Sequence, residues 1–395
     1  MKRYVGTSAF GLRAPIVKEG DDLSQVVIDT VDNAIKYDKI ELRDRDVIAI
    51  TESLLARAQG NYAQIDAITK DLNSKFDEEI GVVFPILSRN RFATVLKAIA
   101  NTNKRISVFL SFPSDEVGNS LFDKELLLGK DISTNVDILN EEEYRNLVGD
   151  KCVHIFTGVD YVKLYKDLAV NDNIEIYLTN NPEKIVERCK EVLIANIHDR
   201  EYLRDTFQRL GAKNVYTIGD ILNKSVDGSG FNEKYGLYGS NLATETSVKL
   251  FPRNSQDFVE NLQTKLKDKY NKDIEVMIYG DGAFKDPVGK IWELADPIVS
   301  PGYTKGLEGT PNEIKIKYIA DTELSHLKGE EASEAIRNKI SEKDSNLVGN
   351  QASEGTTPRQ ITDLLGSLAD LTSGSGDKGT PIVLIQGYFD NYATE

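Results

Sequence analysis

IEIYLTNNPEKIVERCKEVLIANIHDREYLRDTFQRLGAKNVYT, residues 174–217, is the stretch that decides the fold of the middle of this chain. Three short apolar runs rich in Ile, Val, Leu and Tyr alternate with two polar segments of helical length and spacing. Regular alternation of this kind predicts parallel strands joined by right-handed helical crossovers. We therefore expect a small Rossmann-like parallel α/β domain here.

The same alternation extends to both sides of this stretch. Upstream, KCVHIFTG at residues 151–158 is interpreted as a first strand, and residues 160–169 as the helix that follows it. Downstream, residues 226–240 form a glycine-rich loop or linker. No helix of this region opens with GxGxxG or GxxxxGK[ST], so it carries no phosphate-binding motif of its own.

The flanking regions show a second, less regular α/β pattern. The elements expected there are a helix at 23–37, a strand at 47–51, a helix ending near Asn101, a strand at 105–112, a helix at 256–270, a strand at 274–280, a helix at 358–371 and a strand at 382–388. The predicted division is thus a core in two parts, residues 1–123 and 249–395, interrupted by an inserted domain at residues 124–248.

Composition excludes several classes of partner. The 395 residues include 48 basic and 63 acidic side chains, a net charge of −15 that repels nucleic-acid phosphates and anionic lipids. The N-terminal segment lacks an uninterrupted apolar core, and no apolar run approaches the roughly 20 residues of a membrane span. We expect a cytoplasmic protein that binds neither nucleic acid nor membrane.

Cysteine and histidine offer little catalytic material. Cys152 and Cys189 are the only cysteines, and His154, His198 and His326 are scattered without a metal-binding spacing. His154 is expected to be a strand residue. The chemistry is therefore expected to rest on carboxylates, and no catalytic residue is assigned from the sequence.

Acidic turns follow two of the expected strands. SFPSDEVGN carries Asp115 and Asn119, and YGDGAF carries Asp281. Carboxylates at strand ends suit a hard cation such as Mg²⁺ or Mn²⁺, which takes oxygen ligands and bridges to phosphate. The alternative interpretation is that these are ordinary turn residues, which hydrogen-bond to their own backbone.

Two further segments are candidates for binding a phosphate or another anion. SRNRF places Arg89 and Arg91 just before a helix, and the loop SGSGDKG carries Asp377 and Lys378. The alternatives are solvated arginines at a helix start and a flexible loop without a ligand.

Taken together, these segments resemble the coenzyme F-420:L-glutamate ligase family. GLRAPIVKEGDDL and DRDVIAITESLLARAQG are similar to its opening. ISVFLSFPSDEVGN and IEVMIYGDGAF are similar to its strands that end in acidic turns, and DLLGSLADLTSGSGDKGTPIVLIQGY to its helix, glycine loop and final strand. The order agrees throughout. The resemblance covers about residues 4–122 and 251–388 and skips the expected insertion.

The resemblance implies a two-part α/β fold, usually dimeric, that binds GTP and two divalent metal ions, Mg²⁺ or Mn²⁺. ATP is the alternative nucleotide. Such an enzyme activates a small-molecule carboxylate as an acyl phosphate, which the amine of an amino acid, L-glutamate, attacks. By the same resemblance, Asp115 and Asp281 are metal ligands. Nucleotide contacts are implied for Pro15, Ile16, Glu52, Ser53, Arg57 and Asn119.

Three positions depart from the family pattern. Gly282 stands where a threonine is expected to help a second metal, Ser375 stands at an acidic position, and Arg57 replaces a lysine. An alternative hypothesis is therefore a non-catalytic nucleotide- and metal-binding or regulatory protein on the same fold. A further one is a flavin or deazaflavin binder. The inserted domain is where an altered substrate specificity would arise.

Overall fold

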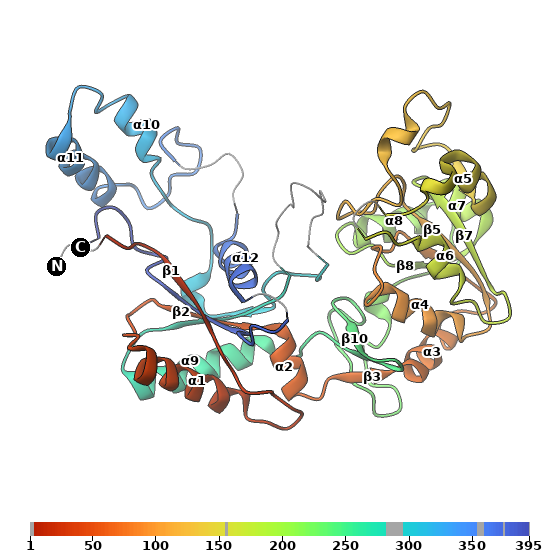
Figure 1. Cartoon of the computed structure of the whole chain (residues 1–395), viewed down its shortest axis with the longest axis horizontal. Helices are drawn as coiled ribbons and strands as arrows, with labels where there is room; N and C mark the ends of the chain where they lie inside the picture. The colour runs from red at the N-terminus through yellow and green to blue at the C-terminus, as the bar shows by residue number, and fades with distance from the viewer. Residues whose placement is uncertain (1–3, 155–156, 282–294, 354–358, 374–375, 395) are drawn as a thin grey trace.

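The computed structural model describes residues 4–154, 157–281, 295–353, 359–373 and 376–394. It is a mixed α/β structure with several sheets, as the sequence predicts. Figure 1 shows a five-stranded and a six-stranded sheet at opposite ends of the molecule, with a small sheet between them.

The five-stranded sheet is built from the two ends of the chain. Its strands are arranged in the order β1-β14-β2-β12-β13. Their bounds are Ser8–Leu12 for β1, Ile382–Gln386 for β14, Val47–Thr51 for β2, Glu275–Tyr279 for β12 and Gly302–Tyr303 for β13. Only β2 and β12 run parallel, and the other neighbours are antiparallel. The strand predicted at 47–51 is confirmed.

Helices cover both faces of this sheet. Helices α1 (Leu23–Asp38) and α9 (Ser255–Tyr270) pack on one face, where Val27 and Leu262 meet Ile48 and Ile278. Helix α12 (Ile361–Ser373) packs on the other face through Leu365 and Ala369. Figure 1 shows α1 and α9 on the side of the sheet opposite α12. Each fully buried aliphatic side chain contributes about 1.5–3 kcal/mol, so the sheet is stabilised from both sides.

The six-stranded sheet has the order β6-β7-β5-β4-β8-β9. Its strands are Ile138–Asn140 for β6, Ile174–Thr179 for β7, Arg105–Leu110 for β5, Glu79–Val83 for β4, Glu191–Ile194 for β8 and Asn214–Thr217 for β9. All neighbours are parallel except the edge pair of β6 and β7. The parallel strands predicted within residues 174–217 are confirmed.

Helices also cover both faces of the six-stranded sheet. Helices α3 (Ile65–Asn73), α4 (Phe92–Ala100) and α6 (Tyr161–Lys166) pack on one face. Helices α7 (Pro182–Arg188) and α8 (Arg200–Arg209) pack on the other. Side chains alternate between the two layers: Val82 belongs to the first core and Val83 to the second.

Sheet membership differs in one respect from the predicted course of the chain. Strands β4 and β5, which precede residue 124, pair directly with β8 and β7. The Rossmann-like sheet therefore draws on residues from both sides of the predicted boundary at 123 and 124. The boundary before β4 is not visible locally, because the strand pairs with β8, which is more than 100 positions further along the chain.

The strand predicted at 151–158 is wrong for the described residues of that segment. Lys151 ends a 3-10 helix (Gly149–Lys151), and Gly158 N donates to His154 O, which makes a turn. Gly158 has a φ of +68°, a conformation that breaks an extended strand. His154 is therefore a buried turn residue whose Nδ1 accepts a hydrogen bond from Thr157 N.

The remaining elements connect or extend the two large sheets. A three-stranded sheet contains β10 (Asn241–Thr244), β11 (Ser247–Lys249) and β3 (Tyr62–Gln64), and α2 is a short helix (Glu52–Ala58). Helices α5 (Glu141–Val148), α10 (Ile316–Asp321) and α11 (Gly329–Ser341) and the 3-10 helices Lys124–Leu127, Ile218–Asp220 and Lys305–Leu307 complete the described elements. No helix in the described ranges has the length and apolar character that a membrane crossing requires.

Candidate functional site

Four chain segments meet at one edge of the five-stranded sheet, where edge means the row of strand ends that includes the carboxyl ends of β2 and β12. Strands β2 and β12 are parallel and end there, and because β14 is antiparallel to β2 it begins there. The loop after β1 reaches the same edge, where Ala14 N donates to Gly379 O at 3.1 Å. Thr51 N donates to Pro381 O at 3.0 Å. Ligands of α/β sheets bind at the carboxyl ends of parallel strands, so this edge is a candidate ligand site.

Most of the predicted nucleotide-contacting residues lie at this edge. Pro15 and Ile16 occupy the exposed first loop, with Ile16 81% exposed. The side chain of Arg57 holds this loop, because its Nε donates to Val17 O at 3.2 Å. Glu52 and Ser53 open α2 directly after β2. The first loop and the β2-to-α2 turn thus form one surface.

The glycine loop borders the same surface. Asp377 and Lys378 are exposed, next to Gly379 and Pro381, which pair with the first loop and the end of β2. The structure therefore brings these two residues to the edge that carries Glu52. Gly282 and Ser375, where the sequence departs from the family pattern, lie outside the described residues.

Glu52 makes a buried ion pair that sequence reasoning missed. Lys249, the last residue of β11, donates to both carboxylate oxygens of Glu52, at 2.6 and 2.8 Å. Both side chains are about nine-tenths buried. Burial raises the pKa of Glu52 above its ordinary value, the positive charge of Lys249 opposes this, and the nearby charge of Asp296 adds to the rise. A buried lysine at the end of an apolar strand was the one available signal.

Arg91 joins two aspartates at the end of β12. Its Nη1 donates to Asp296 Oδ1 at 2.8 Å and its Nη2 to Asp281 Oδ2 at 2.9 Å. Burial lowers the pKa of Arg91, but the charges of Asp296 and Asp281 outweigh this effect and hold the guanidinium firmly protonated. Arg91 comes from the loop between β4 and α4, so these contacts connect the edges of the two large sheets.

Gly280 allows Asp296 to approach the strand end. Asp281 N donates to Asp296 Oδ2 at 2.8 Å, and a Cβ on Gly280 would lie only 2.3 Å from that same oxygen. Asp296 itself is almost fully buried. No sequence pattern marked Asp296 in advance, because it is 15 positions beyond Asp281 and meets it only through the fold.

We call Glu52, Arg91, Lys249, Asp281 and Asp296 the charged cluster. The charges of Asp296 and Arg91 act on the pKa of Glu52, which shows that the two ion-paired groups lie close together. Three carboxylates and two cations leave one net negative charge. Such a site repels a triphosphate unless a divalent cation intervenes, while Arg91 and Lys249 can neutralise individual oxyanions.

Asp115 and Asn119 lie elsewhere, in the turn after β5. Asp115 is buried, and both of its oxygens accept hydrogen bonds. Oδ2 accepts from Leu87 N at 2.8 Å and from Asn119 Nδ2 at 3.0 Å, whereas Oδ1 accepts from Val117 N at 3.2 Å and from Asn119 N at 2.8 Å. Burial raises the pKa of Asp115 to about 6.

These contacts decide how well Asp115 fits a metal. Four N–H donors already occupy its two oxygens, which is the turn arrangement that the sequence left open as an alternative. Within the described ranges, His, Cys, Asp and Glu side chains form no group of three or more that could hold a metal ion. In this arrangement Asp115 fits a metal ligand poorly, and Asp281, which is 23% exposed, fits better.

Arg89 separates from Arg91 despite the short spacing between them. Arg89 is exposed, and its positive charge acts on the buried phenol of Tyr161, where burial is the main cause of a raised pKa. Of the two arginines predicted for anion binding, only Arg91 is placed in the charged cluster by its contacts, whereas Arg89 is exposed to solvent.

Comparison with protein families identifies a match. A family model described as F420-0:gamma-glutamyl ligase matches residues 11–387, nearly the whole chain. The match includes the six-stranded sheet, all of the five-stranded sheet except the start of β1, and every residue of the charged cluster. A search of curated proteins finds no match.

Proposed function

The chain belongs to the F420-0:gamma-glutamyl ligase family, and from this premise we propose that it joins an amino acid to a small-molecule carboxylate through an amide bond. The family suggests a ligase activity. L-Glutamate is the favoured amine, and GTP or ATP is the proposed source of energy. We also propose that the protein acts as a homodimer.

The observation that carries this proposal is the convergence of ligand loops on the charged cluster. The first loop, the β2-to-α2 turn, the end of β12 and the glycine loop meet at the carboxyl ends of a parallel strand pair. That is the position at which α/β sheets bind nucleotides. Backbone N–H groups, Lys378 and Arg57 lie around the edge, where they can meet phosphate oxygens.

The proposed reaction has two steps. The substrate carboxylate attacks the γ-phosphorus of the nucleotide, and the nucleoside diphosphate leaves with the bridging oxygen. The amine of glutamate then attacks the acyl carbon, inorganic phosphate leaves and the amine loses a proton. Arg91 and Lys249 supply fixed positive charge beside the reacting oxygens, which is the main contribution that a protein makes to phosphoryl transfer.

Dependence on Mg²⁺ or Mn²⁺ is part of the proposal. Mg²⁺ is usually held by one or two carboxylates together with phosphate oxygens and water, so Asp281 at the entrance of a net negative cluster meets the requirement. When bound, the ion would neutralise charge on the phosphates. Asp296 is too deeply buried to be a direct ligand and instead positions Asp281 by accepting a hydrogen bond from its backbone N–H.

The test is to trap the acyl phosphate. Protein is incubated with ATP or GTP, Mg²⁺ or Mn²⁺ and a panel of carboxylic acids, with hydroxylamine in place of glutamate. The proposal predicts a hydroxamate from at least one acid, formed in proportion to nucleoside diphosphate. Nucleoside diphosphate released equally with and without any acid would contradict it.

A second candidate is supported by the same contacts. Arg91 pairs with both Asp281 and Asp296, and Lys249 pairs with Glu52, so each carboxylate of the cluster already has an ion-pair partner in this structure. A nucleotide-binding regulatory protein could keep such an arrangement. Nucleotide binding without hydroxamate formation from any acid would favour this candidate.

A further inference from the structure

A small pocket lies at the point where the strand order of the six-stranded sheet reverses. From β4 the chain continues to β5 and β7 on one side, and later to β8 and β9 on the other. The chain therefore leaves the ends of β4 and β8 in opposite directions along the sheet. Doubly wound sheets bind ligands in the crevice that forms between two such strands. Ile86 follows β4, and Ala195 and Ile197 follow β8, and all three line the pocket.

The pocket is apolar with one charged wall. Phe92, Val95, Ile218 and Leu237 contribute to its lining, and the polar side chains are Arg91, Tyr238 and Ser240. Its volume is about 40 Å³. A water-sized sphere needs about 10–15 Å³, so there is room for roughly three heavy atoms.

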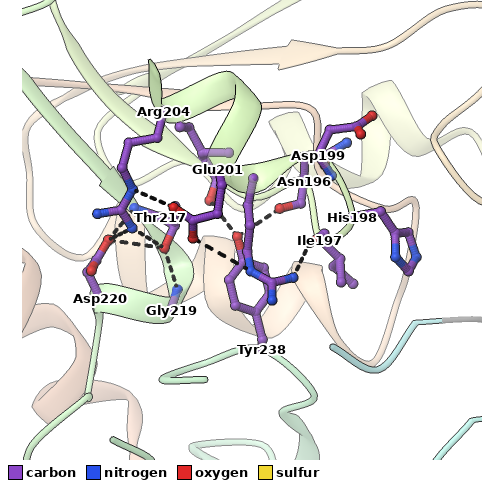
Figure 2. Close-up of polar contacts among 12 residues, drawn as sticks. Asn196, Ile197, His198, Asp199, Glu201, Arg204, Thr217, Gly219, Asp220 and Tyr238 are labelled. Carbon is purple, nitrogen blue, oxygen red and sulfur yellow. Dashed lines mark hydrogen bonds and ion pairs between the residues drawn. The ribbon is translucent and has the colours of Figure 1, made fainter. Parts of the chain in front are cut away.

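The walls of this pocket are fixed by hydrogen bonds. Tyr238 donates through its hydroxyl to Asn196 O at 2.7 Å, and Asp199 N donates to Asn196 Oδ1 at 2.7 Å. Figure 2 shows Tyr238 against the loop that carries Asn196 and Ile197. Glu116 also holds this loop, because its carboxylate accepts from Ile197 N at 2.7 Å. A pocket held in this way is formed before any ligand arrives.

Arg91 connects the pocket to the charged cluster. The guanidinium has five N–H donors, and two of them are engaged with Asp281 and Asp296. Arg91 is also part of the pocket wall. A molecule in the pocket that carries a carboxylate would therefore meet a fixed cation at the boundary with the edge of the five-stranded sheet.

We propose that this pocket binds the carboxylic acid substrate and selects acids whose carboxylate carries a short aliphatic chain. The chain occupies the apolar pocket, the carboxylate meets Arg91, and Leu237 and Val95 set the length that fits. This inference rests on the proposed ligase function, because it assigns that reaction its acid substrate. It also gives the Rossmann-like sheet a role, the recognition of substrate.

The test uses straight-chain acids from acetate to hexanoate as probes on the full-length protein. Their dissociation constants are measured by ligand-observed NMR. Each methylene that enters an apolar pocket strengthens binding about fourfold. The proposal predicts such a rise over roughly three carbons, followed by no further gain. Equal affinity for all the acids, or no binding of any of them, would overturn it.

Two variants separate the pocket from general effects on the core. Leu237→Ala enlarges the pocket, so affinity should keep increasing with chain length for two or three carbons more than in the wild type. Leu96→Ala removes the same atoms from a buried leucine of the same core that does not line the pocket, and should keep the wild-type profile. Val95→Ala serves as a smaller enlargement if Leu237→Ala does not fold. Identical profiles for the enlarged and control variants would overturn the assignment.

A separate nucleotide titration on the same samples distinguishes the two proposals. Chain-length selectivity without nucleotide binding would support the pocket and contradict the ligase reaction. Nucleotide binding without chain-length selectivity would leave the ligase reaction standing and overturn the pocket assignment.

Discussion

Lys249→Met tests the buried ion pair at the base of the proposed site. The substitution keeps most of the side-chain volume and removes the charge that contacts both oxygens of Glu52, at 2.6 and 2.8 Å. Glu52 is then left buried without a direct partner and near Asp296. Removing one member of a buried pair costs about 3–5 kcal/mol. We expect a loss of that size in the free energy of unfolding at pH 8.

The loss should depend on pH in a defined direction. The pKa of Glu52 is already raised above 4.5 by burial, and loss of Lys249 raises it further. A carboxyl group whose pKa is higher in the folded than in the unfolded protein stabilises the fold fully at pH values below its unfolded-state pKa. This stabilisation is lost as the pH rises through its folded-state pKa. The difference between wild type and Lys249→Met should therefore shrink as pH falls from 8 toward 4.5.

Urea unfolding followed by circular dichroism measures this difference. Lys213→Met is the matched control, because Lys213 pairs with Asp77 at 2.5 Å while 62% exposed, and an ion pair in water contributes little to stability. Glu52→Gln combined with Lys249→Met should recover part of the loss. Equal losses for Lys249→Met and Lys213→Met would refute the buried pair.

Three further substitutions test the surrounding contacts. Asp281→Asn should abolish metal-dependent nucleotide turnover and lower the unfolding free energy by less than Lys249→Met does, since Arg91 keeps its ion pair with Asp296; wild-type turnover would refute its role at the metal. Asp115→Asn places an amide N–H₂ among four N–H donors, so unfolding at pH 7 should become easier by about 2–4 kcal/mol with or without metal. Because the pKa of Asp115 is raised to about 6, the stability of wild type over this variant should grow as pH falls from 7 to 4, and a constant difference would argue against the raised pKa. Gly280→Ala displaces Asp296 and should cost about 1–3 kcal/mol and weaken nucleotide binding, whereas Gly6→Ala, where a Cβ meets no atom within 4 Å, should be neutral in both measurements.

Local patterns in the sequence predicted the elements, and they failed where structure depends on distant partners. The apolar run at β2 and the helical spacing of α1 and α9 are visible locally, and both predictions are confirmed. The segment around His154 is apolar enough for a strand, but a positive φ at Gly158 turns the chain back. Sheet membership was harder, because β4 pairs with β8 more than 100 positions away.

In the site too, local sequence predicts the positions of some residues but not their distant partners. Glu52 and Asp281 follow strands, so their position at a sheet edge could be predicted from sequence. Their partners could not, since Lys249 is 197 positions from Glu52 and Arg91 is 190 positions from Asp281. Asp115 has the same local pattern as Asp281, and only the hydrogen bonds from Leu87 and Asn119 distinguish a turn residue from an exposed carboxylate.

The central claim is that the edge of the five-stranded sheet binds a nucleotide with a divalent cation. The most direct measurement is calorimetric titration of ATP and of GTP into the purified protein, with and without Mg²⁺ or Mn²⁺. The net negative charge of the cluster predicts micromolar binding that requires the metal. Absence of binding for both nucleotides under every condition, or binding of equal strength without metal, would contradict the claim.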